Sequence, residues 1–229
     1  MFVVIGIAFK FGAVPFHMWM PDVYQGSSTP VTLLVGSLPK IAAVAIALRV
    51  LAGAMESLHQ DWYLMLVILS ILSMALGNIV AIAQQNIKRM LAYSSIAKMG
   101  LVTGVFGIAL TQPHAATGIT AALVVFTMHH LMLKGTLFLG IGEWQRNGGR
   151  PWLIATLGIL TLALIGAPFT SGAGAKLLLS EATTGTGFDL ALLFGFSTLG
   201  TLFLMARILW LIRLRASTVA SGPDPASLV

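Results

Sequence analysis

The sequence predicts an all-α protein, a polytopic bundle of about seven transmembrane helices. Of its 229 residues, 57% are hydrophobic and 9% are charged, whereas ordinary soluble domains carry about 25% charged residues. Apolar runs of about 20 residues, the length that spans a bilayer, recur along the chain. Short polar or Gly/Pro-rich segments separate them. This pattern leaves little chain for a soluble domain.

The apolar runs predict seven helices in chain order. Their approximate ranges are 1–20, 31–54, 62–84, 90–110, 116–142, 152–181 and 188–213. Two are predicted to be broken, the first at Pro15 and the following HMWMPD, the sixth at GAPFTSGAGAK. Proline removes a helix hydrogen bond and glycine weakens a helix. Irregular backbone at membrane depth is tolerated where protein buries it or where it lines a water-filled cavity, and transporters use broken helices as binding sites.

Charges in the predicted connections indicate the orientation of the chain. Lys and Arg gather after the third helix, after the fifth helix and at the C-terminal end. Basic connections stay on the cytoplasmic side, so the C-terminus is predicted to be cytoplasmic and, with seven spans, the N-terminus to lie outside. The final stretch over 216–229, ASTVASGPDPASLV, is predicted to be a disordered tail.

The composition also excludes several kinds of site. The net charge of +6 comes from scattered basic residues without the stripe that a nucleic-acid backbone requires. With no cysteine, the chain can form no disulfide, thiolate metal site or cysteine-ligated Fe–S cluster. His59 and His114 fall in predicted loops, and the five dispersed histidines predict no metal site. GIGEW and SGAGAK lack the context of a dinucleotide or phosphate loop.

Lysine and arginine divide between the spans and the membrane edges. Five of the six lysines fall inside predicted spans: Lys10, Lys40, Lys98, Lys134 and Lys176. The arginines lie toward the membrane edges, where long side chains can snorkel, and all seven acidic residues lie in loops or at helix ends. These lysines therefore have no structural salt-bridge partner within the spans. Because a charge at mid-membrane costs about 3 kcal/mol, their presence points to a function.

Lysine in a span is suited to moving protons. Burial can lower the pKa of a lysine until it releases its proton, whereas arginine stays charged, so the five lysines predict a proton relay. Two alternatives remain open: the lysines pair with carboxylates of a partner, or they snorkel. His130 and Lys134, four residues apart, share one helix face, and His titrates near neutral pH. His129 and His17 are further candidates, and a histidine bonded to a neighbouring helix carbonyl is the alternative for His129 and His130.

Four motifs follow one another and cover nearly the whole chain. They are FKFGAVPFHMWMPDVYQGSSTPV, NIKRMLAYSSIAKMGLV, HHLMLKGTLFLGIG and GAPFTSGAGAKLLL. They resemble the antiporter-like subunits of respiratory complex I, especially the subunit N type, a family shared with Mrp-type cation/proton antiporters and membrane-bound hydrogenases. The resemblance implies two inverted five-helix repeats, each with a broken helix. This chain, as one domain over 1–215, would hold the end of the first repeat (1–54) and the second repeat (62–213).

The resemblance implies roles for five of the candidates. Lys10 matches the lysine of the first broken helix, which is coupled to a glutamate on an earlier helix. Lys40 matches the central lysine of the cytoplasmic half channel. His130 and Lys134 match the groups that connect the half channels, and Lys176 matches the lysine or glutamate at the periplasmic exit.

Three features depart from the family pattern. Lys98 stands where relatives more often have His or Gln, and GAGAK replaces the aromatic residues often seen near the second break. The glutamate and the helices that carry it are absent, as expected of a fragment, a split gene or a truncated reading frame. A further chain or segment is therefore expected to supply them.

The expected function is proton translocation by a multi-pass subunit of an NADH:quinone oxidoreductase-type complex in a bacterial-type inner (plasma) membrane. The expected partners are other membrane subunits and lipid. NADH, quinone, FMN and Fe–S clusters would be bound only by partner subunits, and no cofactor by this chain. Two rivals remain open: an Mrp-type sodium/proton antiporter subunit driven by ion gradients, and a non-conducting assembly scaffold, since half of the first channel is missing.

Overall fold

The computed structural model describes residues 2–54, 59–109, 111, 116–147, 150–184 and 190–220. Within these ranges all regular secondary structure is helical, which confirms the predicted all-α class. Five helices are long and apolar enough to cross a membrane. They are α3 (Thr29–Arg49), α4 (His59–Ala83), α5 (Ile87–Ala109), α6 (Ala116–Asn147) and α9 (Leu190–Ala220). A π-helical turn, Val50–Ala54, continues α3. The chain is therefore a multi-pass integral membrane protein.

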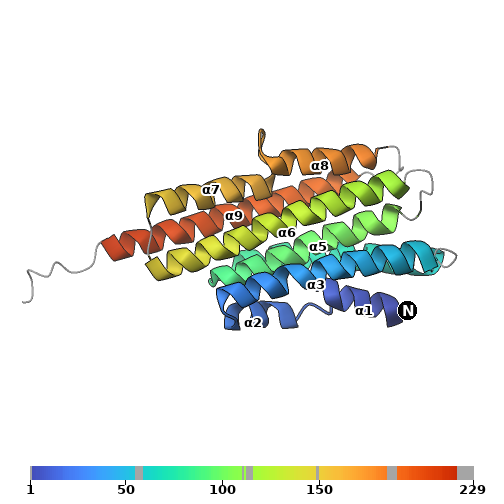
Figure 1. Ribbon diagram of the computed structural model, residues 1–229, viewed down its shortest axis with the longest axis horizontal. Coiled ribbons are helices and arrows are strands. Elements are labelled where there is room, and N and C mark those ends of the chain that lie inside the picture. Colours follow the sequence, from blue (N-terminus) through green and yellow to red (C-terminus); the bar gives the residue numbers. More distant parts are fainter. Residues whose placement is uncertain are drawn as a thin grey trace, which may run out of the picture.

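The remaining four helices form two broken pairs. The first pair is α1 (Phe2–Phe11) and α2 (Trp19–Gly26), and the second is α7 (Pro151–Ile165) and α8 (Ser171–Ala182). In Figure 1 each pair lies roughly end to end along the bundle, so each occupies the place of one spanning helix. The seven predicted helices thus correspond to five continuous helices and two broken ones.

The first break lies where Pro15 predicts it, but the helix after it is longer than expected. Gly12 adopts a φ of +71°, and the Val14–Pro15 peptide bond is cis. The Val14 amide, released from helical bonding, donates to Ser73 Oγ on α4 at 2.9 Å. The predicted end near residue 20 is wrong because α2 continues to Gly26.

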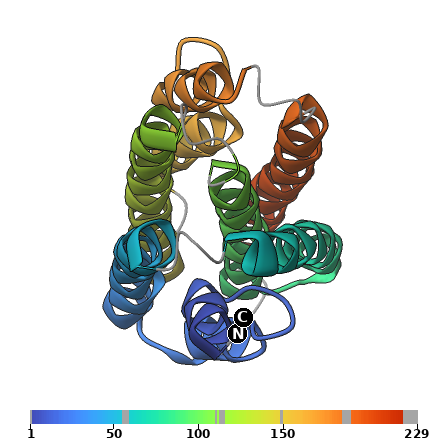
Figure 2. The ribbon, with the colours of Figure 1, turned by 90° about the vertical axis from the view of Figure 1, so that its right-hand side faces the viewer.

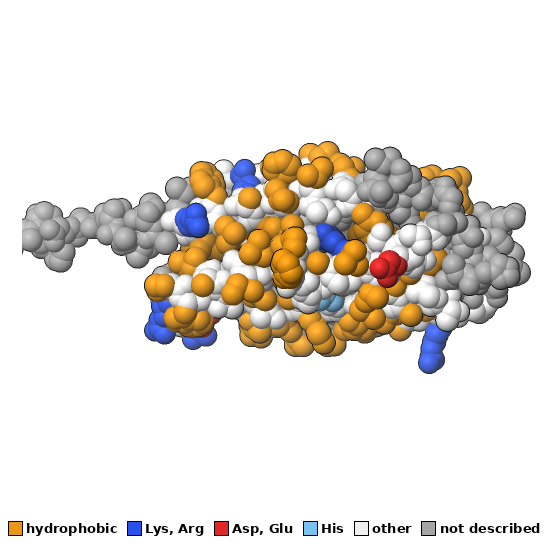
Figure 3. Space-filling model, turned by 90° about the horizontal axis from the view of Figure 1, so that it is seen from above, with side chains coloured by type: hydrophobic (Ala, Val, Ile, Leu, Met, Phe, Trp, Pro, Cys, Tyr) orange, Lys and Arg blue, Asp and Glu red, His pale blue; other side chains and the backbone are white. Residues whose placement is uncertain are grey.

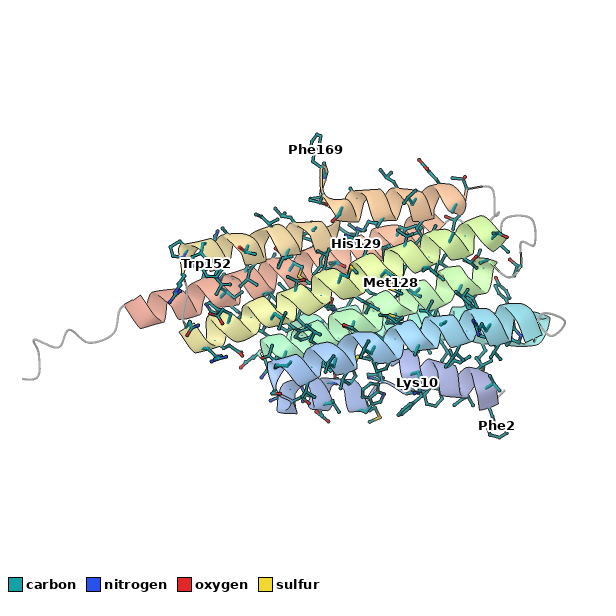
Figure 4. All side chains as sticks on the ribbon, in the orientation of Figure 1. Phe2, Lys10, Met128, His129, Trp152 and Phe169 are labelled. Atoms are coloured by element: carbon teal, nitrogen blue, oxygen red, sulfur yellow. The ribbon has the colours of Figure 1, made fainter. Side chains whose placement is uncertain are left out.

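The second break occupies a shorter stretch than its sequence predicts. Gly166, with a φ of +81°, ends α7, and Phe169 has a φ of +66° and is fully exposed at the turn. Figure 4 shows Phe169 projecting away from the bundle. Gly172 and Gly174 lie inside α8 and not in the break. At the C-terminal end, α9 continues to Ala220, past the predicted limit of 213, and 221–229 of the predicted tail lie outside the described residues.

Helix α5 is the centre of the bundle. The end-on view places it in the middle of the other helices (Figure 2), and it packs against α2, α4, α6 and α9. Its sequence GLVTG places Gly100 and Gly104 one turn apart, a spacing that lets membrane helices approach closely. A Cβ at Gly100 would lie 2.8 Å from Ser73 Cβ and 3.0 Å from the Ser70 carbonyl oxygen of α4. The small residues therefore allow the tight α4–α5 contact that buries the middle of α5.

The outer surface is apolar, as a lipid-facing surface must be. Figure 3 shows hydrophobic side chains over much of the face that carries α7 and α8. Exposed residues on this side include Ile159, Leu162 and Leu177. This surface agrees with the membrane placement inferred from helix length.

Candidate functional site

Two apolar cores fill the two ends of the bundle, and a polar layer separates them. On α5 one core ends at Ile96 and the other begins at Met99. On α6 one ends at Phe126 and the other begins at Leu137. The titratable side chains that lie between the cores are Lys40, Lys98, His130 and Lys134. The candidates thus gather at one level near the middle of the membrane-spanning helices.

Lys40 lies in the middle of α3 with its side chain 1% exposed. Its Nζ donates to the Tyr24 hydroxyl at 3.1 Å and lies 3.8 Å from Met20 Sδ. Nζ is also 5.6 Å from the centroid of the Tyr24 ring, within the range of a cation–π contact. Both partners belong to α2, so the second half of the first broken helix surrounds the Lys40 amine.

Lys134 and His130 lie one turn apart on α6, and both are buried. Neither Lys134 Nζ nor His130 Nε2 has a hydrogen-bond partner among the residues that the structure describes. The His130 ring stacks on Phe126 with centroids 6.5 Å apart. A buried polar group without a partner costs about 1–3 kcal/mol. Packing alone therefore gives no reason for a lysine at position 134.

Lys98, in the centre of α5, has partners on α9. Its Nζ donates to Ser197 Oγ at 2.8 Å and lies 3.5 Å from the Ser197 carbonyl oxygen. The side chain is 2% exposed. Lys98 therefore adds a further amine to the polar layer.

Lys176 follows the second break by one turn and a half of α8. Its Nζ donates to the Ile165 carbonyl, at the end of α7, and to Thr198 Oγ1 on α9 at 2.9 Å. Because Gly166 ends α7 in a left-handed conformation, the Ile165 carbonyl is free to accept this bond. The break thus provides the Lys176 amine with a backbone acceptor.

Substitution of Gly166 by alanine is expected to destabilise this site. A left-handed conformation costs a residue with a Cβ about 1–2 kcal/mol, and the new Cβ would lie 2.9 Å from Lys176 Cδ and 3.0 Å from Nζ. Thermal unfolding should show a lower midpoint for Gly166→Ala than for Gly174→Ala, because no atom lies within 4 Å of a Cβ at position 174. Equal midpoints would contradict this assignment.

The four amines form a succession across the bundle. Lys134 interacts electrostatically with Lys40 and with Lys98, and Lys98 interacts with Lys176. His130 lies among them and interacts with Lys134, Lys98 and Lys40. The order is therefore α3, α6, α5 and α8, with Lys98 between Lys134 and Lys176.

No carboxylate neutralises this succession within the described ranges. The salt bridge found there joins Arg89 to Asp22 at 2.6 Å, at the end of the bundle where α5 begins. Glu143 and Glu181 lie near the C-terminal ends of α6 and α8. Pairing with the acids that the structure describes therefore does not explain the lysines of the layer.

The remaining candidates lie away from the four amines. Lys10 is exposed on α1 (Figure 4), and His17 lies in the first break, partly buried. His129 is partly buried, and its Nε2 is 2.9 Å from Ser171 Oγ at the start of α8, so it contacts the second broken helix through a hydroxyl. The side chains of His59 and His114 lie outside the described residues.

Sequence reasoning missed the hydroxyl partners of the lysines. Tyr24, Ser197 and Thr198 are ordinary residues of apolar helices by pattern, and no spacing rule joins them to a lysine on another helix. They lie 16, 99 and 22 residues from their respective lysines. Only the tertiary packing brings them together.

Comparisons with known proteins agree with this architecture. Residues 1–203 match the family model described as NADH:quinone oxidoreductase/Mrp antiporter, transmembrane. The chain is 44% identical over 204 residues to NADH-quinone oxidoreductase subunit N of Herminiimonas arsenicoxydans, covering 81% of this chain and 41% of that protein. It is also 44% identical over 201 residues to subunit N of Thiobacillus denitrificans, covering 82% and 40%. The chain thus spans about two fifths of the length of these relatives.

Solved structures share the fold at lower identity. A chain of the Mrp complex from Dietzia sp. DQ12-45-1b superposes with a TM-score of 0.77 at 21% identity, over 92% of this chain and 40% of that one. A chain of respiratory complex I from Thermus thermophilus superposes with a TM-score of 0.69 at 24% identity, over 90% and 46%. These likenesses confirm the antiporter-like fold. With the family model matching most of its length, the chain belongs to the NADH:quinone oxidoreductase/Mrp antiporter transmembrane family.

Proposed function

We propose that this chain translocates protons across a bacterial inner membrane as part of an NADH:quinone oxidoreductase-type complex. The observation that carries the proposal is the succession of four buried or partly buried amines, from Lys40 to Lys176, across an otherwise apolar bundle. The sequence relatives, which are NADH-quinone oxidoreductase subunits N, favour the redox-driven complex over an Mrp antiporter. The C-terminus is cytoplasmic in this proposal because Lys and Arg gather at that end and in two connections.

Like-charge repulsion provides a mechanism for passing protons along the layer. Two ammonium groups interact strongly where water is scarce, so a proton on Lys134 disfavours a proton on its neighbours Lys40 and Lys98. A proton that arrives at Lys40 therefore promotes release of a proton from the next group in the succession. The transfer continues through His130 and Lys134 to Lys98 and Lys176. Redox events in partner subunits would bias the first of these steps.

The rest of the channel belongs to partners in this proposal. The exposed Lys10 on α1 would face the helices and the glutamate that another chain or segment supplies. NADH, quinone, FMN and Fe–S clusters would be held by other subunits, which accept and pass on the electrons. This chain would contribute the proton path alone.

Reconstitution of the complete complex in proteoliposomes tests the proposal. Lys40→Ala and Lys176→Ala are each expected to reduce NADH-driven proton translocation at least about tenfold, which corresponds to about 1.4 kcal/mol of barrier. Lys88→Ala, at the only lysine outside the predicted spans, should retain translocation.

Three outcomes separate the rival functions. Translocation that survives both lysine substitutions would refute the proton path. Sodium/proton exchange driven by an ion gradient in vesicles without redox subunits would assign the chain to the Mrp class. Co-purification with quinone-reducing subunits without any proton movement would leave the scaffold as the remaining function.

A further inference from the structure

The Tyr24 side chain is the closest hydrogen-bonding neighbour of Lys40. Tyr24 is 0% exposed, and its hydroxyl oxygen lies 3.1 Å from Lys40 Nζ. The same hydroxyl has a hydrogen-bonding neighbour on α5, Ser95, which is one turn before Lys98. One phenol therefore joins α2, α3 and α5 at the level of the polar layer.

The packing around the ring holds the hydroxyl in place. Phe138 of α6 meets the Tyr24 ring edge to face, with centroids 5.5 Å apart. On α3, one turn before Lys40, Gly36 provides space for the hydroxyl: a Cβ there would lie 3.1 Å from the Tyr24 oxygen and 3.4 Å from Cζ. Because α3, α5 and α6 all contact the phenol of α2, its oxygen has little freedom to leave the Lys40 amine.

A phenol can serve an amine in both protonation states. It accepts a hydrogen bond from a charged ammonium, which has donors only. When the lysine has lost its proton, the amine nitrogen gains a lone pair and the phenol O–H can rotate to donate to it. No bond to the tyrosine hydrogen breaks in this exchange, so Tyr24 stays protonated throughout.

We propose that Tyr24 is a positioning residue for Lys40, holding Nζ at one place in the layer by a hydrogen bond that reverses direction as Lys40 gains and loses its proton. The inference rests on the proposed proton path and adds to it a residue on the first broken helix. The other titratable groups that interact with Lys40 are His130 and Lys134 of α6. Of the other helices packed against α3, α1 carries the exposed Lys10, and α2 carries Asp22, which pairs with Arg89.

The test is the pH profile of NADH-driven proton translocation by the complete complex in proteoliposomes, comparing Tyr24→Phe with the parent. Phenylalanine keeps the ring contacts and removes the hydroxyl. Because hydrogen bonds to charged groups are roughly twice as strong as neutral ones, loss of the hydroxyl destabilises charged Lys40 more than neutral Lys40. The alkaline limb of the pH profile should therefore move to lower pH by about one unit. Tyr93→Phe is the matched control, since the Tyr93 hydroxyl has no hydrogen-bond partner among the described residues, and its profile should stay unchanged.

Two further variants make each outcome decisive. Gly36→Ala leaves Tyr24 present but crowds its oxygen, so it should shift the same limb in the same direction even if Tyr24→Phe fails to assemble. If Lys40→Ala abolishes translocation while Tyr24→Phe and Gly36→Ala both keep the parent profile, the role of Tyr24 is refuted and the proton path stands. If Lys40→Ala leaves translocation intact, the proton path itself is refuted, and the role of Tyr24 with it.

Discussion

Replacing Lys134 with methionine is expected to slow proton translocation strongly and, at the same time, to stabilise the protein. Lys134 is 3% exposed, and its Nζ has no hydrogen-bond partner among the described residues. Methionine has a similar length and removes a buried polar group without a partner, which costs about 1–3 kcal/mol. It also removes the amine between Lys40 and Lys98. The rate of translocation should therefore fall at least about tenfold, which corresponds to a barrier about 1.4 kcal/mol higher.

Thermal unfolding and NADH-driven proton uptake, measured on the same preparation, check both halves of this expectation. Lys176→Met is the matched control, because Lys176 bonds the Ile165 carbonyl and Thr198. That variant should lose translocation without gaining stability, since the substitution removes two hydrogen bonds. A Lys134→Met protein that unfolds at a lower temperature than the parent would show that the amine is a structural element.

Replacing Gly100 with leucine should prevent the bundle from assembling. The added side chain would collide with Ser73 and with the backbone of α4, since even a Cβ would lie 3.0 Å from the Ser70 carbonyl oxygen and 3.1 Å from the Met74 amide nitrogen. Overpacking a core costs about 1–3 kcal/mol, and more where backbone must move. Because α5 contacts four other helices, the displacement cannot be confined to one pair.

The yield of folded protein in membranes, and its unfolding midpoint in detergent, measure this effect. Gly158→Leu in α7 is the control, because no atom lies within 4 Å of a Cβ at that position. It should express like the parent, since leucine is the better helix former. Similar yields for the two variants would mean that α4 and α5 do not pack as described.

The helices and their breaks were predictable because each depends on local sequence. Apolar length predicts a span, and Pro15 and Gly166 interrupt a helix wherever it packs. The ends of helices were less predictable: α2 reaches Gly26 and α8 includes Gly172 and Gly174. In those segments tertiary contacts stabilise helix against weak local preference.

The lysines of the candidate site were predictable from the sequence, but the residues that contact them were not. A lysine in a span is costly enough to be noticed in sequence alone, and the spacing of His130 and Lys134 places them on one face. The place of Lys98 between Lys134 and Lys176, and the contact of Tyr24 with Lys40, depend on how α2, α3, α5 and α6 pack. Sequence separation carries no information about such contacts.

The most direct test of the proton path is the number of protons translocated per electron at matched rates of NADH oxidation. Complexes that contain the parent chain, Lys98→Met or Lys134→Met would be compared in the same liposomes. The proposed path predicts that both substitutions lower the ratio by the same amount, because each interrupts one succession of amines. A ratio equal to that of the parent in both variants would show that protons do not pass through these lysines.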